Sequence, residues 1–181
     1  MRDTTIARNY AEAFLELARK ANDLEGWGRM LDDVASAMKS DVTLRRFLET
    51  PKVGAGTKSE LLGRALTGTL PVHVVRFLQA VTKRGRQMLI PEIAIAYASL
   101  VDEVVGRVHA TVTLARPTDA AERASIAAAL STSLGKIVVP HVVIDPTIIG
   151  GAIVRVGDSV RDGSVKRRLA ILRQRMVHGA R

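Results

Sequence analysis

The chain has 181 residues, enough for one ordinary domain or two small ones, and 47% of them are apolar, enough to fill a core. It contains no cysteine, which excludes disulfide bonds and thiolate metal sites. Residues 1–106 carry 15 basic and 13 acidic side chains and residues 107–181 carry 12 and 5, so the basic second half suits nucleic acid, an anionic membrane or an acidic protein.

Helical spacing of apolar residues recurs throughout residues 4–106. Turn-forming segments such as "TPKVGAG" and "TGTLP" divide this region into about six helices. The first helix carries the stripe Ile6, Tyr10, Ala13 and Leu17, and the last begins near Pro91. The pattern predicts an N-terminal six-helix bundle over residues 1–106.

After Gly106 the spacing changes from helical to alternating, which predicts a strand over "RVHATVTL". A helix capped by Thr118 follows, with Ile126, Leu130 and Leu134 on one face. The next segment, "KIVVPHVVI", predicts a second strand, and Pro140 favours the edge of the sheet. Residues 107–181 are therefore predicted to form a small α/β domain, which makes the whole chain α+β.

The stretch "DPTIIGGAIVRVGDSVRDGSVKRRL", residues 145–169, resembles neither a dinucleotide-binding loop nor a calcium loop in the order of its glycines and carboxylates. Its pattern predicts a hairpin followed by a terminal helix whose inward stripe is Val165, Leu169, Leu172 and Met176. The residues expected to make the turns and caps are Asp145, Gly150, Gly151, Gly157, Asp158, Asp162, Gly163 and Ser164.

No local pattern indicates catalysis, a cofactor or a metal. His73, His109, His141 and His178 lie in four different segments, without the spacing that places two imidazoles on one helical face. The segment "GAGTKSE" lacks the glycine that precedes the lysine of a phosphate-binding loop, so it predicts an ordinary helix start. We therefore predict no catalytic, cofactor-binding or metal-binding residue and no cofactor.

Two predicted surfaces each allow more than one interpretation. The first predicted helix is apolar over roughly 200° and the fifth over roughly 160°, which fits either the middle of a bundle or a groove that holds a partner helix. The tail "VKRRLAILRQRMVHGAR" contains no acidic residue. It fits a solvated basic face at a helix end, or a docking site for an acidic helix or for phosphates.

With a helical first half and an α/β second half, the chain resembles the delta subunit family of rotary ATP synthases, called the oligomycin-sensitivity-conferring protein in mitochondria. The opening helix "ARNYAEAFLELA" and the junction "KRGRQMLIPEI" are similar to those of the family. The stretch "DPTIIGGAIVRVGDSVRDGSVKRRLAIL" resembles its C-terminal signature closely. The resemblance covers essentially the whole chain.

The resemblance implies a non-catalytic stator, or peripheral-stalk, subunit that clamps the catalytic head to the membrane-anchored b subunit and so couples proton-driven rotation to ATP synthesis. Residues 1–106 would bind the N-terminal helices of the alpha subunits and residues 107–181 the C-terminus of the b subunit. The residues expected at the alpha-subunit interface are Tyr10, Ala13, Phe14, Phe77, Leu78 and Val81. Those expected at the b-subunit interface are Arg161, Lys166, Arg167 and Ile171.

The resemblance also implies a cellular location for the protein. Because the sequence begins with methionine and shows no transit segment, we expect a bacterial protein, peripheral to the cell membrane on its cytoplasmic side and bound there only through partners. The alternative that the charge supports is a basic nucleic-acid-binding protein. Steep salt dependence of binding would distinguish it from an apolar helix groove.

Overall fold

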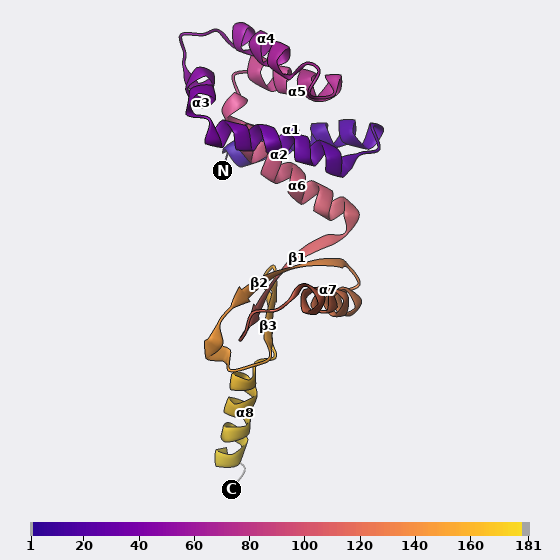
Figure 1. Ribbon diagram of the computed structural model, residues 1–181, viewed down its shortest axis with the longest axis vertical. Helices are drawn as coiled ribbons and strands as arrows, with labels where there is room; N and C mark the ends of the chain where they lie inside the picture. The colour runs from indigo at the N-terminus through magenta and orange to yellow at the C-terminus, as the bar shows by residue number, and fades with distance from the viewer. Residues whose placement is uncertain (1, 179–181) are drawn as a thin grey trace. The chain divides into compact units, whose positions relative to one another are not determined.

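The computed structural model describes residues 2–178, with side chains over residues 4–176. The chain divides into two compact units, Met1–Asp102 and Glu103–Arg181, and the division falls in the last turn of helix α6 (Figure 1). The first unit is helical. Its elements are α1 (Arg2–Lys20), α2 (Leu24–Ser40), α3 (Val42–Glu49), α4 (Ala55–Leu66), α5 (Val72–Lys83), the 3₁₀ turn η1 (Gln87–Leu89) and α6 (Ile90–Val105).

Short aspartate caps start two of these helices. Asp23 accepts a hydrogen bond from the backbone N–H of Gly26 at 2.8 Å at the start of α2. Asp41 accepts from the N–H groups of Thr43 and Leu44 at 2.8 and 3.1 Å at the start of α3. Each cap satisfies N–H groups that have no partner within the helix. A helix can therefore begin directly at the aspartate, and the turns that join α1, α2 and α3 are very short.

The second unit contains a four-stranded mixed sheet and two helices. Its elements are β1 (Arg107–Leu114), α7 (Ala120–Leu134), β2 (Ile137–Ile144), the 3₁₀ turn η2 (Pro146–Ile148), β3 (Ala152–Val156), β4 (Ser159–Asp162) and α8 (Val165–His178). The strand order is β2-β1-β3-β4. Strands β1 and β2 are parallel and joined through α7, whereas β3 pairs antiparallel with β1 and with β4. The predicted α+β class is confirmed.

Alternation along β1 gives this sheet one buried face. Ala110, Val112 and Leu114 are buried, and α7 covers them with Ile126, Leu130 and Leu134, as the pattern predicted. The alternate residues His109 and Thr111 are exposed and point to the opposite face. Strand β2 lies at the edge of the sheet, as expected for a strand containing Pro140.

Two local predictions for this unit were wrong. The N-cap of α7 is Asp119, whose carboxylate accepts from the N–H of Glu122 at 2.7 Å, and not Thr118. An aspartate in the next position can take the same N–H, so spacing alone did not separate the two candidates. The predicted inward stripe of α8 is the second error, because its members are exposed rather than packed against the sheet.

Candidate functional site

Helix α1 lies against several helices of the first unit at once. Phe14 is fully buried, with ring centroids 4.5 Å from Phe77, 5.1 Å from Tyr97 and 5.2 Å from Trp27. These rings come from α1, α2, α5 and α6, so one side chain joins four helices. Most of the wide apolar arc of α1 is therefore filled within the bundle, which is the central-helix alternative left open by the sequence.

The six residues expected at an alpha-subunit interface separate into two groups. Phe77, Leu78, Val81 and Phe14 are buried in the core, whereas Tyr10 is half-buried and Ala13 is exposed. The structure brings Tyr10 onto Phe77 in an edge-to-face contact with centroids 6.4 Å apart. Tyr10 and Ala13 are thus the two members of the set whose side chains a partner could reach without opening the bundle.

These two residues belong to a longer partly exposed row. Ile6, Tyr10, Ala13 and Leu17 follow helical spacing along one side of α1, and none of the four is fully buried. We call this row the α1 stripe. It has the i, i+4, i+7, i+11 pattern through which one amphipathic helix receives another.

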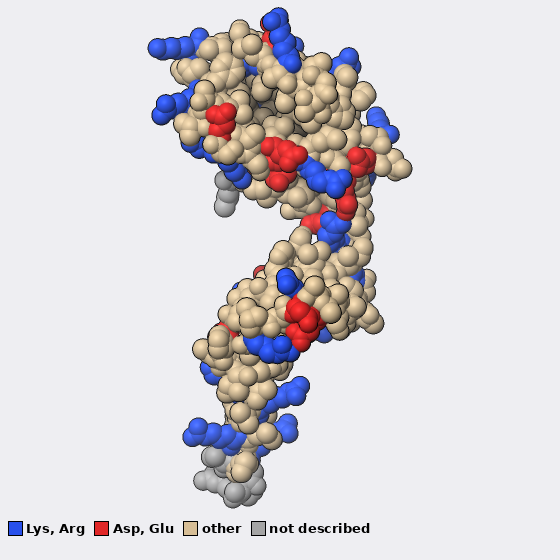
Figure 2. Space-filling model, in the orientation of Figure 1, with Lys and Arg blue, Asp and Glu red and all other residues tan. Residues whose placement is uncertain are grey.

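The second surface is the terminal helix α8. Its apolar side chains are largely open to solvent: Leu169 is 52% exposed, Leu172 54% and Met176 79%. Basic side chains gather around the same helix (Figure 2), namely Lys166, Arg167, Arg168, Arg173 and Arg175. No acidic residue occurs in the α8 sequence. A helix that carries an uncovered apolar row among cations is suited to an acidic amphipathic partner.

The residues expected at a b-subunit interface are all exposed and come from two elements. Lys166, Arg167 and Ile171 lie on α8, whereas Arg161 lies on β4 and donates to the hydroxyl of Ser133 on α7 at 3.4 Å. The sequence did not show that the apolar row of α8 is exposed, because apolar residues have the same spacing in a helix that is buried.

The glycine and aspartate motif makes turns and caps, as predicted. Gly157 and Asp158 form the two-residue turn between β3 and β4, with Val156 and Ser159 as the last paired residues. Gly157 has φ +54°, the left-handed conformation that this turn requires. The backbone N–H of Gly163 donates to the carbonyl of Ala152 at 2.9 Å and so ties the end of β4 to the start of β3.

Two carboxylates of the motif hold the chain on either side of the hairpin. The N–H of Thr147 donates to Asp145 and the N–H of Ser164 to Asp162, each at 2.9 Å. Hydrogen bonds from Thr147 lower the pKa of Asp145, and those from Ser164 lower the pKa of Asp162. Ser164 then caps α8 by accepting from the N–H of Arg167 at 3.2 Å.

Two glycines of the motif place the first turn of α8. The carbonyl of Gly150 accepts from the N–H of Val165 at 2.9 Å. Gly151 has φ +79°, and a Cβ built on it would lie 2.5 Å from the carbonyl oxygen of Gly163. The motif therefore sets the direction in which α8 leaves the sheet.

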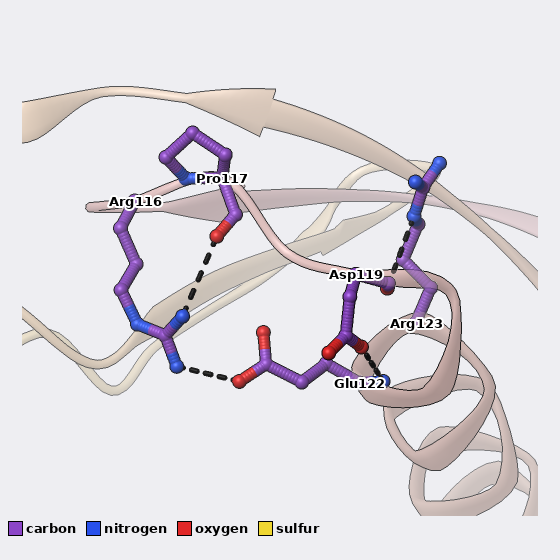
Figure 3. Close-up of polar contacts among 5 residues, drawn as sticks. All are labelled: Arg116, Pro117, Asp119, Glu122 and Arg123. Carbon is purple, nitrogen blue, oxygen red and sulfur yellow. Dashed lines mark hydrogen bonds and ion pairs between the residues drawn. The ribbon is translucent and has the colours of Figure 1, made fainter.

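A pocket of about 570 Å³ lies where β1 ends and α7 begins. Arg116 and Glu122 both line it, and Arg116 donates to Glu122 at 2.5 Å, while Asp119 caps α7 by accepting from the N–H of Glu122 (Figure 3). The opposite wall comes from Ile149, Gly150 and Gly151. The sequence could not show this pocket, because its walls are far apart along the chain.

Among the described residues, we find neither a metal centre with three or more protein ligands nor a membrane span. Within residues 2–178, no group of three or more histidine and carboxylate side chains is placed to hold a metal ion. None of the described helices combines the length and the hydrophobicity that crossing a membrane requires.

Comparison with known proteins decides the family. Residues 6–176 match the model of the ATP synthase delta (OSCP) subunit family. The chain belongs to this family. An ATP synthase subunit delta from Gemmatimonas aurantiaca is 54% identical over 172 residues, covering 95% of this chain and 93% of the relative. One from Thioalkalivibrio sulfidiphilus is 37% identical, covering 92% and 93%.

A solved structure shows the same fold. A chain of the Toxoplasma gondii mitochondrial ATP synthase hexamer matches with a TM-score of 0.58 and 19% identity, covering 94% of this chain and 97% of that one. The match over residues 6–176 and the relatives named above confirm the family resemblance inferred from the sequence. Nothing in the comparisons favours the nucleic-acid alternative.

Proposed function

We propose that this ATP synthase delta family member is a peripheral-stalk subunit that holds the catalytic head to the membrane-anchored b subunit. The observation that carries the proposal is the family match over residues 6–176, which includes both compact units. A rotor that turns inside the head exerts torque on it. Only a connection to something fixed in the membrane lets that torque change the conformation of the catalytic sites.

The first unit would bind an N-terminal helix of an alpha subunit along the α1 stripe. Tyr10 and Ala13 would contact that helix directly, since their side chains reach the surface. The other four residues of the predicted interface would act from beneath, because Phe77 supports Tyr10 and Phe14 packs on Phe77. Binding of this kind depends on apolar area and is weakly sensitive to salt.

The second unit would bind the C-terminus of the b subunit through α8. The exposed row of Leu169, Leu172 and Met176 would supply the binding energy. Lys166 and Arg167 in the first turn of α8 and Arg161 on β4 would orient an acidic partner and speed its approach. Ile171, an exposed apolar residue of α8, would add contact area. The subunit itself would be non-catalytic, and it would lie on the cytoplasmic side of a bacterial membrane only through these partners.

A co-sedimentation experiment tests the proposal. The purified chain is mixed with the head of alpha and beta subunits, with the soluble part of the b subunit, and with both. We expect the b fragment to sediment with the head only when the chain is present. Failure of the chain to bind either component, together with salt-sensitive binding to DNA, would overturn the proposal in favour of the basic nucleic-acid-binding alternative.

A further inference from the structure

Two histidines that are far apart in the sequence lie together on the second unit. The Nδ1 atom of His109 on β1 is 2.8 Å from the Nε2 atom of His141 on β2. Their rings stack with centroids 5.0 Å apart and planes inclined by 27°. The spacing of histidines along the chain concealed this pair, because it depends on the parallel pairing of β1 with β2.

The pairing register explains why both rings share one face. Ala110 and Val112 of β1 point into the core, so His109 and Thr111, which alternate with them, point away from α7. Thr111 is paired with His141, and paired residues of parallel strands project to the same side. Both imidazoles are exposed, so an ion can reach them from solvent.

Two neighbouring imidazole nitrogens suit a metal ion that prefers nitrogen. With Zn–N bonds of about 2.0–2.1 Å and tetrahedral angles, two ligand nitrogens lie about 3.4 Å apart. The observed separation of 2.8 Å is within small side-chain rotations of that value. We propose that His109 Nδ1 and His141 Nε2 form a bidentate site for a divalent transition-metal ion, with water in the remaining positions.

The surroundings make this a weak, exchangeable site. Arg155 of β3 is paired with Thr111, so it lies diagonally across from His109, about 7–8 Å away, and two strands from His141, about 10 Å away. Its positive charge weakens cation binding, and salt screens this repulsion only in part over these distances. Since the ion bridges β1 and β2, it binds the folded unit in preference to the unfolded chain and stabilises it.

The test is a titration of the full chain with Zn²⁺ alone, followed by NMR of the imidazole nitrogens. We expect saturable shifts at Nδ1 of His109 and Nε2 of His141, and a rise in the thermal unfolding midpoint. Mg²⁺, which prefers oxygen ligands, should cause neither change. Equal responses to the two ions, or shifts at other nitrogens only, would overturn the proposal.

Variants supply the matched control. His109→Gln and His141→Gln should each weaken Zn²⁺ binding by roughly tenfold or more, because one of two protein ligands is lost. His73→Gln, which removes an exposed histidine of α5, should leave the affinity unchanged. Both sheet substitutions are at exposed positions, and circular dichroism checks their folding. Unchanged Zn²⁺ affinity in both variants would contradict the site. If either variant fails to fold, the imidazole nitrogen shifts of the unaltered chain decide whether the site exists.

Discussion

At the scale of single residues, Gly151 lies against Gly163 and Ser164, the two residues that precede α8. Alanine there would meet the carbonyl of Gly163 at 2.5 Å and would also have to adopt φ +79°. Gly157 is a matched control, because it too has positive φ but its Cβ would meet nothing within 4 Å. The two positions separate backbone strain from steric collision.

We expect Gly157→Ala to lose about 1–2 kcal/mol of unfolding free energy, the cost of a left-handed alanine. Gly151→Ala should lose clearly more, because the collision with Gly163 adds to the same strain. Urea denaturation of both variants measures the difference. Equal losses would show that the close approach of Gly151 to Gly163 does not constrain α8.

Lys58 is a buried cation of the first unit. Its Nζ donates to the carbonyls of Leu48 and Thr50 at 2.6 and 2.7 Å, at the C-terminal end of α3. Lys58→Met should destabilise the unit by about 1–3 kcal/mol, because the half-buried carbonyl of Thr50 loses this donor. Lys52→Met removes an exposed lysine nearby and should change little. Identical denaturation midpoints for the two variants would contradict this role of Lys58.

Asp162 makes the stability of the second unit depend on pH. Hydrogen bonds from Ser164 lower its pKa in the folded state, so its contribution is complete above the unfolded pKa of about 3.9 and is lost as pH falls through the lower folded value. The stability difference between the unaltered chain and Asp162→Asn should therefore be largest near neutral pH and shrink below about pH 4. Urea denaturation across this range measures it, and a difference independent of pH would refute it.

At the scale of elements, the sequence predicted the local structure and the buried face of β1, but not the exposure of α8. The change of period after Gly106 correctly placed the start of β1, because alternation and helical spacing are set by backbone geometry. The hairpin at Gly157 and the cap at Ser164 were predicted because their hydrogen bonds join near neighbours. By contrast, an apolar row on α8 has the same spacing whether it faces a core or solvent, so its exposure appears only in the fold.

The exposed row of α8 predicts a separation between stability and binding. Leu169→Asp and Leu172→Asp should leave the unfolding free energy within about 0.5 kcal/mol, as is usual at surface sites. Each should weaken binding of the b-subunit fragment by about 2 kcal/mol if the row is the contact. Calorimetry measures the affinity, and Ile95→Ala, at an exposed apolar position on α6, serves as control. Loss of stability without loss of affinity would mean that the row packs within this chain.

At the scale of the whole molecule, the two compact units carry surfaces of different chemistry. The first unit has small net charge and offers the α1 stripe on a well-filled helical core. The second carries most of the positive charge and offers an uncovered helix. This division matches a protein that holds two different partners at once, one through apolar area and one with electrostatic orientation.

The most direct test of this account is a fluorescence titration of Trp27 with a peptide of the first ~20 residues of the alpha subunit, at low and high salt. Trp27 is buried against Phe14 of α1, so a helix bound along the α1 stripe should perturb it. We predict a saturable change that persists at high salt, that Ala13→Lys abolishes and that Ala37→Lys, at an exposed alanine of α2, preserves. No saturable change, or one that high salt removes, would contradict the stator account.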